Sequence, residues 1–375
     1  MVEVRSVDSR RDLSAFLRVP WRVYDGDATW VPPLLAERRR HVGRANPFVR
    51  RAQVMLFVAW RDGAAVGRVS AQLDPMAQPS DAPAVGHFGL LEATDREAMG
   101  ALLRAAEDAL RRAGAARVEG PYSLSINDES GLLVDGFDRP PRLLMNYAPP
   151  WYGEALAELG YAKATDLLAY RFTVSRPLPR RALRVAEETA GLPDVAERPL
   201  DPRRLRRDMR AVIEIFNDAW AGNRGFVPMT DADLEYLTKS LKPALDARLV
   251  RLVEVGGEPA AMIVALPDLN QAIRDLDGRL LPFGWARLLW RLRRRPPRDG
   301  RVLLMGVRRR YHGTPLSAGL AALSIARLHA AAQAAGMREI ELSWVLEDNR
   351  PTIRLIDLVG AEFDKRYRLY SKDLA

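Results

Sequence analysis

The chain contains no cysteine and only four histidines. Without cysteine it has no disulfide, no thiolate nucleophile and no zinc–thiolate site. The histidines are His41, His87, His312 and His329, and their spacing is unlike that of metal ligands, so we expect no bound metal. The absence of cysteine is also compatible with a reducing compartment.

Long apolar runs are missing as well. No stretch of about 20 apolar residues occurs, so the sequence predicts no membrane-spanning helix. The first residues, Met1–Ser6, do not have the pattern of a signal peptide. We therefore expect a cytoplasmic protein that can associate peripherally with the inner face of a membrane. The length of 375 residues favours two globular domains.

Positive charge exceeds negative charge, with 57 Lys and Arg against 48 Asp and Glu and a net charge of +9. Acidic partners fit this excess: coenzyme A, a nucleic acid or an anionic membrane. A genome rich in G and C would produce the same arginine content without any such partner.

The most informative stretch runs from Arg301 to Lys372. A short apolar run, Val302–Val307, predicts a buried strand, and the basic segment Arg308–Pro315 follows it. Leu316–Ala335 then predicts a helix, with Pro315 in its first turn and Gly336 as its cap. Loop N–H groups, a helix N-terminus and arginines together suit a pyrophosphate.

The chain continues with a strand (339–345), a turn, a helix (352–358) and a last strand (365–372). The first half repeats this order with strands at 53–60, 65–73, 85–91 and 116–119 and a helix at 94–113 that is capped by Thr94. Its strand-to-helix connection is the acidic Glu92–Asp95, so we do not expect this half to bind coenzyme A in the usual way.

This order of elements resembles the Gcn5-related N-acyltransferase (GNAT) superfamily, whose Arg-x-x-Gly-x-Gly/Ala loop holds the pyrophosphate of coenzyme A. Arg310–Pro315 matches that loop, except that Pro315 lacks one N–H donor. Asn349 matches the next motif, but its Gly-Phe pair is slightly displaced here, with Gly360-Ala361 followed by Phe363. The tyrosine that often serves as the acid in the family is replaced here by Ile356, so this role cannot be carried over.

The resemblance implies an α/β (α+β) fold with two tandem acyl-CoA N-acyltransferase domains, each a mixed twisted sheet flanked by helices. We expect an N-terminal domain at 1–174 without the pyrophosphate loop and a linker at 175–193. The C-terminal domain is expected at 194–375, with the acyl-CoA loop and a basic insertion at 267–300.

A narrower resemblance rests on Val31–Leu34, Asn46–Phe48, Val66–Arg68, Gly120–Pro121, Ser125–Asn127 and Gly136–Asp138. These segments resemble a bacterial family of N-acyltransferases of about this length. Some of its members are similar to bacterial ceramide synthases, which acylate a sphingoid base from acyl-CoA. The resemblance thus implies a transferase of lipid, and specifically sphingolipid, metabolism.

The superfamily resemblance implies that acyl-CoA contacts Val307, Arg308, Arg309, Arg310, Tyr311, Gly313, Thr314, Leu316 and Asn349. Glu341 and Ser343 share one strand face and are candidates for handling the amine proton. A solvated strand face is the alternative for the carboxylate of Glu341. His312 is a candidate because its unperturbed pKa is near neutrality. Tyr367 and Tyr370 are candidate acids for the leaving thiolate. They lie on opposite faces of the last strand, so at most one can face the site, and packing is the alternative for each.

The long irregular stretch after Gly120 is rich in polar and aromatic side chains, and such loops are often functional. We expect an acceptor site formed by Tyr122, Ser125, Asn127, Asp128 and Tyr147. The alternative is a loop that is packed by its own aromatic residues.

The insertion contains a basic amphipathic segment at 280–295. Trp285, Leu288, Leu289 and Leu292 recur at helical spacing, with Arg287, Arg291 and Arg294 on the other face. This composition is typical of a helix that lies on an anionic membrane surface. The alternative is a helix that covers the edge of its own domain.

These patterns favour an acyl-CoA-dependent N-acyltransferase that transfers a long acyl chain to an amine, such as a sphingoid base. Two alternatives remain: an aminoacyl-tRNA-dependent transferase of the peptidoglycan type, and a non-catalytic acyl-CoA or lipid-binding protein. The basic glycine loop favours coenzyme A over nucleic acid.

Overall fold

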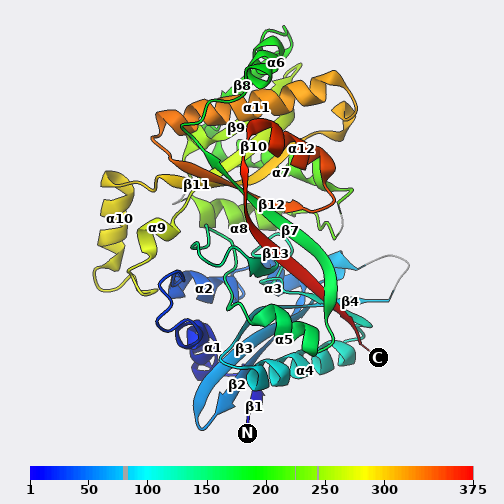
Figure 1. Cartoon of the computed structure of the whole chain (residues 1–375), viewed down its shortest axis with the longest axis vertical. Coiled ribbons are helices and arrows are strands. Elements are labelled where there is room, and N and C mark those ends of the chain that lie inside the picture. Colours follow the sequence, from blue (N-terminus) through cyan, green and yellow to red (C-terminus); the bar gives the residue numbers. More distant parts are fainter. Residues whose placement is uncertain (79–82, 224, 243–244, 375) are drawn as a thin grey trace. The chain divides into compact units, whose positions relative to one another are not determined.

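Parallel and antiparallel strands are combined with helices in this chain, as its computed structural model shows (Figure 1). The structure describes residues 1–78, 83–223, 225–242 and 245–374. The predicted mixed α/β fold is confirmed. The chain forms two compact units: unit 1 comprises Met1–Leu167, Ile273–Leu288 and Lys365–Ala375, and unit 2 comprises Leu168–Ala272 and Leu289–Asp364.

The first part of the chain supplies most of unit 1. Its elements are β1 (Glu3–Ser6), α1 (Arg10–Val23), α2 (Leu35–His41), α3 (Pro47–Arg51), β2 (Gln53–Arg61), β3 (Ala64–Leu73), η1 (Pro75–Ala77), β4 (Val85–Ala93), α4 (Arg96–Arg112), β5 (Arg117–Gly120), β6 (Leu132–Asp135), α5 (Tyr152–Glu158) and β7 (Ala162–Thr173).

The second part supplies most of unit 2. Its elements are α6 (Arg180–Ala190), β8 (Val195–Pro199), η2 (Pro202–Arg204), α7 (Leu205–Trp220), α8 (Asp231–Leu241), η3 (Ala247–Leu249), β9 (Val250–Val255), β10 (Glu258–Pro267), α9 (Asn270–Ile273), α10 (Gly284–Arg294), β11 (Asp299–Val307), η4 (Arg309–Tyr311), α11 (Pro315–Ala334), β12 (Glu339–Leu346), α12 (Arg350–Val359) and β13 (Glu362–Asp373).

The unit boundaries fall inside four of these elements: β7, α9, α10 and β13 each have residues in both units. These compact units need not coincide with the two repeats of a tandem fold, so the predicted repeat limits 1–174 and 194–375 stay a prediction.

In unit 1 the strand order is β1-β2-β3-β4-β5-β13, and β6 also pairs with β13. The end of β13 pairs antiparallel with β5 from Tyr370 opposite Gly120 to Asp373 opposite Arg117, so residues far apart in sequence complete this part of the sheet.

In unit 2 the strand order is β12-β11-β10-β9-β8, and only β11 and β12 run parallel among these described pairs. Leu320 and Leu323 of α11 pack on Ala260 and Ala261 of β10. On its far side α11 contacts α6 so closely that a Cβ at Gly319 would lie 2.2 Å from Thr189 Oγ1. A second apolar cluster joins α7, through residues such as Phe216, to β9 and β10.

Helix ends mostly follow the chemistry of their residues. Thr314 caps α11, Pro315 occupies its first turn, and Gly336 and Gly360 adopt the positive φ angles of 70° and 75° that glycine tolerates. The expected cap of α4 was wrong by one residue. Asp95 rather than Thr94 accepts the hydrogen bond from Ala98 N, because the carboxylate reaches the free N–H group and also pairs with Arg61.

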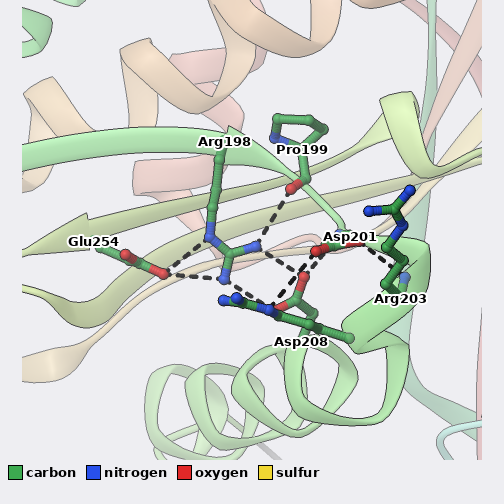
Figure 2. A network of polar contacts seen from close by, with 7 residues as sticks. Arg198, Pro199, Asp201, Arg203, Asp208 and Glu254 are labelled. Carbon is green, nitrogen blue, oxygen red and sulfur yellow. Dashed lines mark hydrogen bonds and ion pairs between the residues drawn. The ribbon is translucent and has the colours of Figure 1, made fainter.

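A polar network fixes α7 to the outer strands of unit 2 (Figure 2). Arg198 of β8 donates two hydrogen bonds to Asp208 of α7, at 2.8 and 2.9 Å, and another of 3.0 Å to Glu254 of β9. The backbone N–H of Asp201 donates to Asp208 at 2.8 Å. Burial raises the pKa of Asp208, but the hydrogen bonds from Arg198 and Asp201 outweigh it, so the pKa lies below its usual value.

We predict that Asp208→Asn destabilises the protein by about 3 kcal/mol, because it leaves Arg198 facing a neutral amide in a buried pair. This cost lies at the lower end for buried pairs because the Arg198 side chain is 35% exposed. Urea unfolding at neutral pH measures the destabilisation. The control is Glu235→Gln in the exposed pair with Lys239, which should cost at most about 0.5 kcal/mol. Equal destabilisation of the two variants would contradict this prediction.

The same pair predicts a pH dependence. Since the pKa of Asp208 is lower in the folded than in the unfolded protein, its stabilisation is complete above the unfolded pKa of about 4. It is lost as the pH falls through the lower folded value. The stability difference between the parent protein and Asp208→Asn should therefore shrink below pH about 4 in parallel urea titrations.

Candidate active site

Two parallel strands of unit 2 separate directly before the basic loop. β11 and β12 pair over only four positions, from Asp299 opposite Glu339 to Val302 opposite Leu342. Beyond them β11 continues to Val307 along β10, and within the described residues its ladder with β12 has ended. Main-chain groups of β11 beyond Val302 are therefore available on the side that faced β12.

Helix α7 covers β11 where this separation occurs. Trp220 Nε1 donates a hydrogen bond of 3.1 Å to Met305 O. A Cβ at Gly306 would lie 3.0 Å from Ala219 Cβ, so the helix lies almost directly against the strand. The Trp220 ring also meets the Trp344 ring of β12 edge to face at 5.8 Å. Two half-buried indoles thus lie beside the end of the β11–β12 ladder.

The first two arginines of the basic loop are engaged by acids of α7. Arg308 forms a 3.3 Å ion pair with Glu214, and Arg309 pairs with Asp218 at 3.5 Å. Asp218 also accepts a 2.6 Å hydrogen bond from the Arg309 backbone. Sequence reasoning missed both acids. Their i, i+4 spacing opposite the apolar stripe of α7 was the only available signal.

The rest of the loop is exposed and partly preorganised. The Arg310 guanidinium lies 4.9 Å from the centre of the Tyr311 ring, and Gly313 adopts a φ of 76° with open space beside it. Thr314 caps α11 by accepting from Ser317 N at 3.3 Å. Val307 and Leu316, at the two ends of the loop, belong to one apolar cluster. Of the three arginines, Arg310 has no carboxylate partner in the described structure.

His312 folds back onto the end of β11. Its Nε2 lies 2.8 Å from Val307 O, and a carbonyl oxygen can only accept, so Nε2 carries the proton. Nδ1 is then the basic nitrogen of the neutral ring. The residue is exposed, as expected for a loop position, although its ring is tied down.

The candidates Glu341 and Ser343 are buried, with exposed fractions of 2% and 6%. The alternative of a solvated strand face is therefore wrong for Glu341. Ser343 Oγ donates to Glu341 Oε1 at 2.6 Å and accepts from Arg301 Nε at 2.8 Å. Arg301, opposite Glu341 in the β11–β12 register, is itself only 3% exposed and was not recognised from the sequence. Arg301, Ser343 and Glu341 are thus joined by consecutive hydrogen bonds in the protein interior.

Other expected site residues have local roles. Asn349 Oδ1 accepts from Thr352 N at 3.2 Å and caps α12. Ile356, at the position of the superfamily's tyrosine, packs with Tyr170 and Val345. Tyr367 lies in unit 1 with no exposed surface, whereas Glu341, Ser343 and His312 lie in unit 2.

No helix of the described chain is long and apolar enough to span a bilayer.

Unit 1 has the same strand separation, but its own chain occupies it. β4 and β5 pair in parallel only from Val85 opposite Arg117 to His87 opposite Glu119. Tyr122 N then donates to Phe88 O at 2.7 Å. A Cβ at Gly89 would lie 1.5 Å from Tyr122 O, so the loop passes directly over β4.

The N-terminus of α4 already holds a carboxylate. Asp95 caps the helix and pairs with Arg61 at 2.7 Å. The Arg61 guanidinium and the Ala98 N–H lower the pKa of Asp95 to about 2. A pyrophosphate here would meet a fixed negative charge, in agreement with the acidic connection seen in the sequence.

Four of the expected acceptor residues belong to this loop of unit 1. Tyr122 and Ser125 are buried, whereas Asn127 and Asp128 are half-buried. Asp128 accepts from Ser125 N at 3.2 Å, and burial raises its pKa. Tyr147 lies in a separate aromatic group, where its hydroxyl donates to Asp27 at 2.8 Å.

The chain resembles solved structures over its whole length. A tandem GNAT protein from the clavulanic acid biosynthesis pathway matches with a TM-score of 0.58 and 14% identity, covering 100% of this chain and 99% of that one. A GCN5-related N-acetyltransferase from Sphaerobacter thermophilus matches with a TM-score of 0.52 and 17% identity, covering 100% and 96%. The chain thus has the tandem GNAT fold that the sequence predicted.

Relatives with clear sequence similarity are bacterial. The chain is 42% identical over 377 aligned positions to the bacterial ceramide synthase of Caulobacter vibrioides, covering 100% of this chain and 98% of that protein. It is 38% identical to protein YghO of Escherichia coli, covering 99% and 95%. No protein-family model matches. The chain belongs to the family of these two proteins and is an N-acyltransferase.

We predict that Ser343→Ala costs about 1–3 kcal/mol of folding stability, because Arg301 and Glu341 are both deprived of the hydroxyl between them. The control is Ser324→Ala, since Ser324 is also buried but donates to Leu320 O of its own helix. This control should cost less than about 1 kcal/mol. Urea unfolding compares the two, and a larger destabilisation by Ser324→Ala would rule out a special role of the Ser343 network.

Proposed function

We propose that the protein transfers a long-chain acyl group from coenzyme A to the amine of a sphingoid base, forming a ceramide-type amide. The separation of β11 from β12 before the basic loop is the observation that carries this proposal. The Caulobacter relative, a bacterial ceramide synthase that shares 42% identity over the whole chain, supports the acceptor class.

Acyl-CoA would enter unit 2 with its pyrophosphate at the loop Arg310–Leu316. Arg310 supplies charge, and Gly313 leaves space for a phosphate oxygen near the N-terminus of α11. Arg308 and Arg309 act mainly by holding the loop on α7, because Glu214 and Asp218 balance their charge. Asn349 acts by capping α12, and Pro315 contributes no N–H to the anion.

The thioester would lie between the separated strands. Main-chain N–H groups of β11 near Met305 can then polarise its carbonyl. The amine nitrogen attacks the carbonyl carbon, the C–S bond breaks, and coenzyme A leaves as a thiolate that takes up a proton. The rings of Trp220 and Trp344 offer an apolar surface for the first carbons of the acyl chain.

Glu341 and Ser343 are the proposed acceptors of the amine proton. Since Ser343 Oγ donates to Glu341, a proton taken up by the hydroxyl can pass to the carboxylate, while Arg301 fixes the orientation of Ser343. His312, with a basic Nδ1, is the second candidate for this role. The proposed acceptor contacts remain Tyr122, Ser125, Asn127, Asp128 and Tyr147 of unit 1, and Tyr367 remains a proposed acid.

A sphingoid base resides in a membrane, so its acylation requires a peripheral contact with one. We assign this contact to residues 280–295, on the inner face of the cell membrane.

Ligand binding tests the first step. We expect palmitoyl-CoA to raise the melting temperature more than acetyl-CoA or free coenzyme A, because the acyl chain adds apolar contacts. Ligand at about 100 times its Kd should add about 2.7 kcal/mol of stability. Arg310→Ala and Gly313→Asp should abolish the shift, whereas Arg206→Ala, on an exposed position of α7, should retain it. An unchanged melting temperature with all three ligands would refute the coenzyme A site and leave aminoacyl-tRNA as the donor to test.

Turnover tests the chemistry. Mass spectrometry should detect the amide when the protein is given palmitoyl-CoA and a detergent-solubilised sphingoid base. Glu341→Gln should lower kcat by about 10²–10⁴-fold, the usual range for a general base, while the palmitoyl-CoA thermal shift persists. Acylation of water-soluble amines alone would exclude the ceramide-type acceptor. Binding of palmitoyl-CoA without any turnover would favour a non-catalytic lipid-binding protein.

A further inference from the structure

Exposed apolar side chains concentrate in one short segment. The described chain has eleven large hydrophobic residues with substantial exposure, and five of them lie between positions 281 and 290. Their exposed fractions are 79% for Leu281, 79% for Phe283, 54% for Trp285, 41% for Leu289 and 51% for Trp290. Such a cluster is costly in water and marks a surface that is covered by a partner.

The remaining side chains of this segment hold it in place. Leu288 packs with Val31, Ile273 and Leu276, all in unit 1. Arg287 pairs with Asp275 at 2.6 Å, and Arg291 donates to Ala272 O at 2.8 Å. The stripe expected from helical spacing is therefore divided: Leu288 packs against the protein, whereas Trp285 and Leu289 are exposed. Through Leu288 the helix covers part of its own unit, while its other side is exposed.

The charge of the segment has a single sign. Residues 278–298 contain seven arginines and no acidic residue: Arg279, Arg287, Arg291, Arg293, Arg294, Arg295 and Arg298. Arg293, Arg294 and Arg295 are exposed, and Arg295 lies 5.4 Å from the Trp290 ring. Exposed tryptophans and arginines on one short helix match the boundary of an anionic bilayer, where indoles and long cationic side chains reside.

Resting on the proposed lipid acceptor, we infer that residues 280–295 dock the enzyme on an anionic lipid bilayer. The boundary between headgroups and acyl chains takes up the five exposed apolar side chains, Leu281, Phe283, Trp285, Leu289 and Trp290. The three consecutive arginines contact lipid phosphates. Lipid phosphates are favoured over a protein partner, because they supply negative charge to Arg293, Arg294 and Arg295, which are exposed and have no carboxylate partner in the described structure.

Vesicle flotation without acyl-CoA or acceptor tests this inference. The vesicles contain phosphatidylcholine alone or with about one third phosphatidylglycerol, at low and high salt. We expect binding to anionic vesicles that weakens as salt rises. Phe283→Ser with Trp290→Ser should weaken binding at least about tenfold, because two large apolar side chains no longer enter the bilayer. Arg293→Ala with Arg294→Ala should weaken it about fivefold per arginine.

A matched control carries two apolar-to-serine changes elsewhere. Leu192 and Leu358 are each 44% exposed, so Leu192→Ser with Leu358→Ser should leave vesicle binding unchanged. Equal binding of the parent protein to neutral and anionic vesicles would overturn the inference. Absence of vesicle binding, together with a self-association that the Phe283 and Trp290 changes abolish, would also overturn it and assign the surface to a second copy of the chain.

Activity on detergent-solubilised sphingoid base separates this inference from the proposed function. The docking variants should retain that activity and lose only activity on base embedded in anionic vesicles. Vesicle binding without amide formation in either assay would refute the proposed acceptor while supporting the docking surface. Full activity of the docking variants on embedded base would refute the docking surface alone.

Discussion

The short ladder between β11 and β12 is the constraint on which the site in unit 2 depends. These parallel strands pair over four positions and then separate. Beyond that point their main-chain groups no longer bind each other and need other partners. Helix α7 supplies one of them, since Trp220 donates a hydrogen bond to Met305 O, and Asp218 of the same helix accepts one from the Arg309 backbone just beyond β11. Arg301, Ser343 and Glu341 are drawn into one buried network because the paired end of the ladder sets Arg301 opposite Glu341.

The two units use the same strand separation differently. In unit 1 the segment after β5 turns back over β4, and Gly89 has no side chain to obstruct Tyr122. The helix that follows is capped by Asp95, so an anion would be repelled there. In unit 2 the corresponding helix begins after a glycine loop with Arg310 exposed. The same separation of parallel strands thus leaves unit 2 suited to an anionic ligand, whereas in unit 1 the space is filled by the loop that follows β5.

The arginines behind the net positive charge have two different surroundings. Many arginines are neutralised locally, as Arg198 is by Asp208 and Glu254, and these pairs fix helices to strands (Figure 2). Residues 278–298 differ in part: Arg287 pairs with Asp275, whereas the exposed Arg293, Arg294 and Arg295 have no carboxylate partner in the described structure. Composition alone cannot separate the two uses, since only the fold brings a distant carboxylate to an arginine.

Local chemistry determined much of this protein. The apolar run of β11, the long α11, and the stops at Gly336 and Gly360 depend on neighbouring residues, and the motif order that resembles the GNAT superfamily followed from them. Tertiary structure decided the rest. It buried Glu341 and Ser343 behind Arg301, paired Arg308 and Arg309 with α7, and turned Leu288 of α10 inward while leaving Trp285 outside. It also placed the end of β13 beside β5. Each of these outcomes joins residues far apart in the chain, and the spacing of residues along a sequence carries no information about which distant groups will meet.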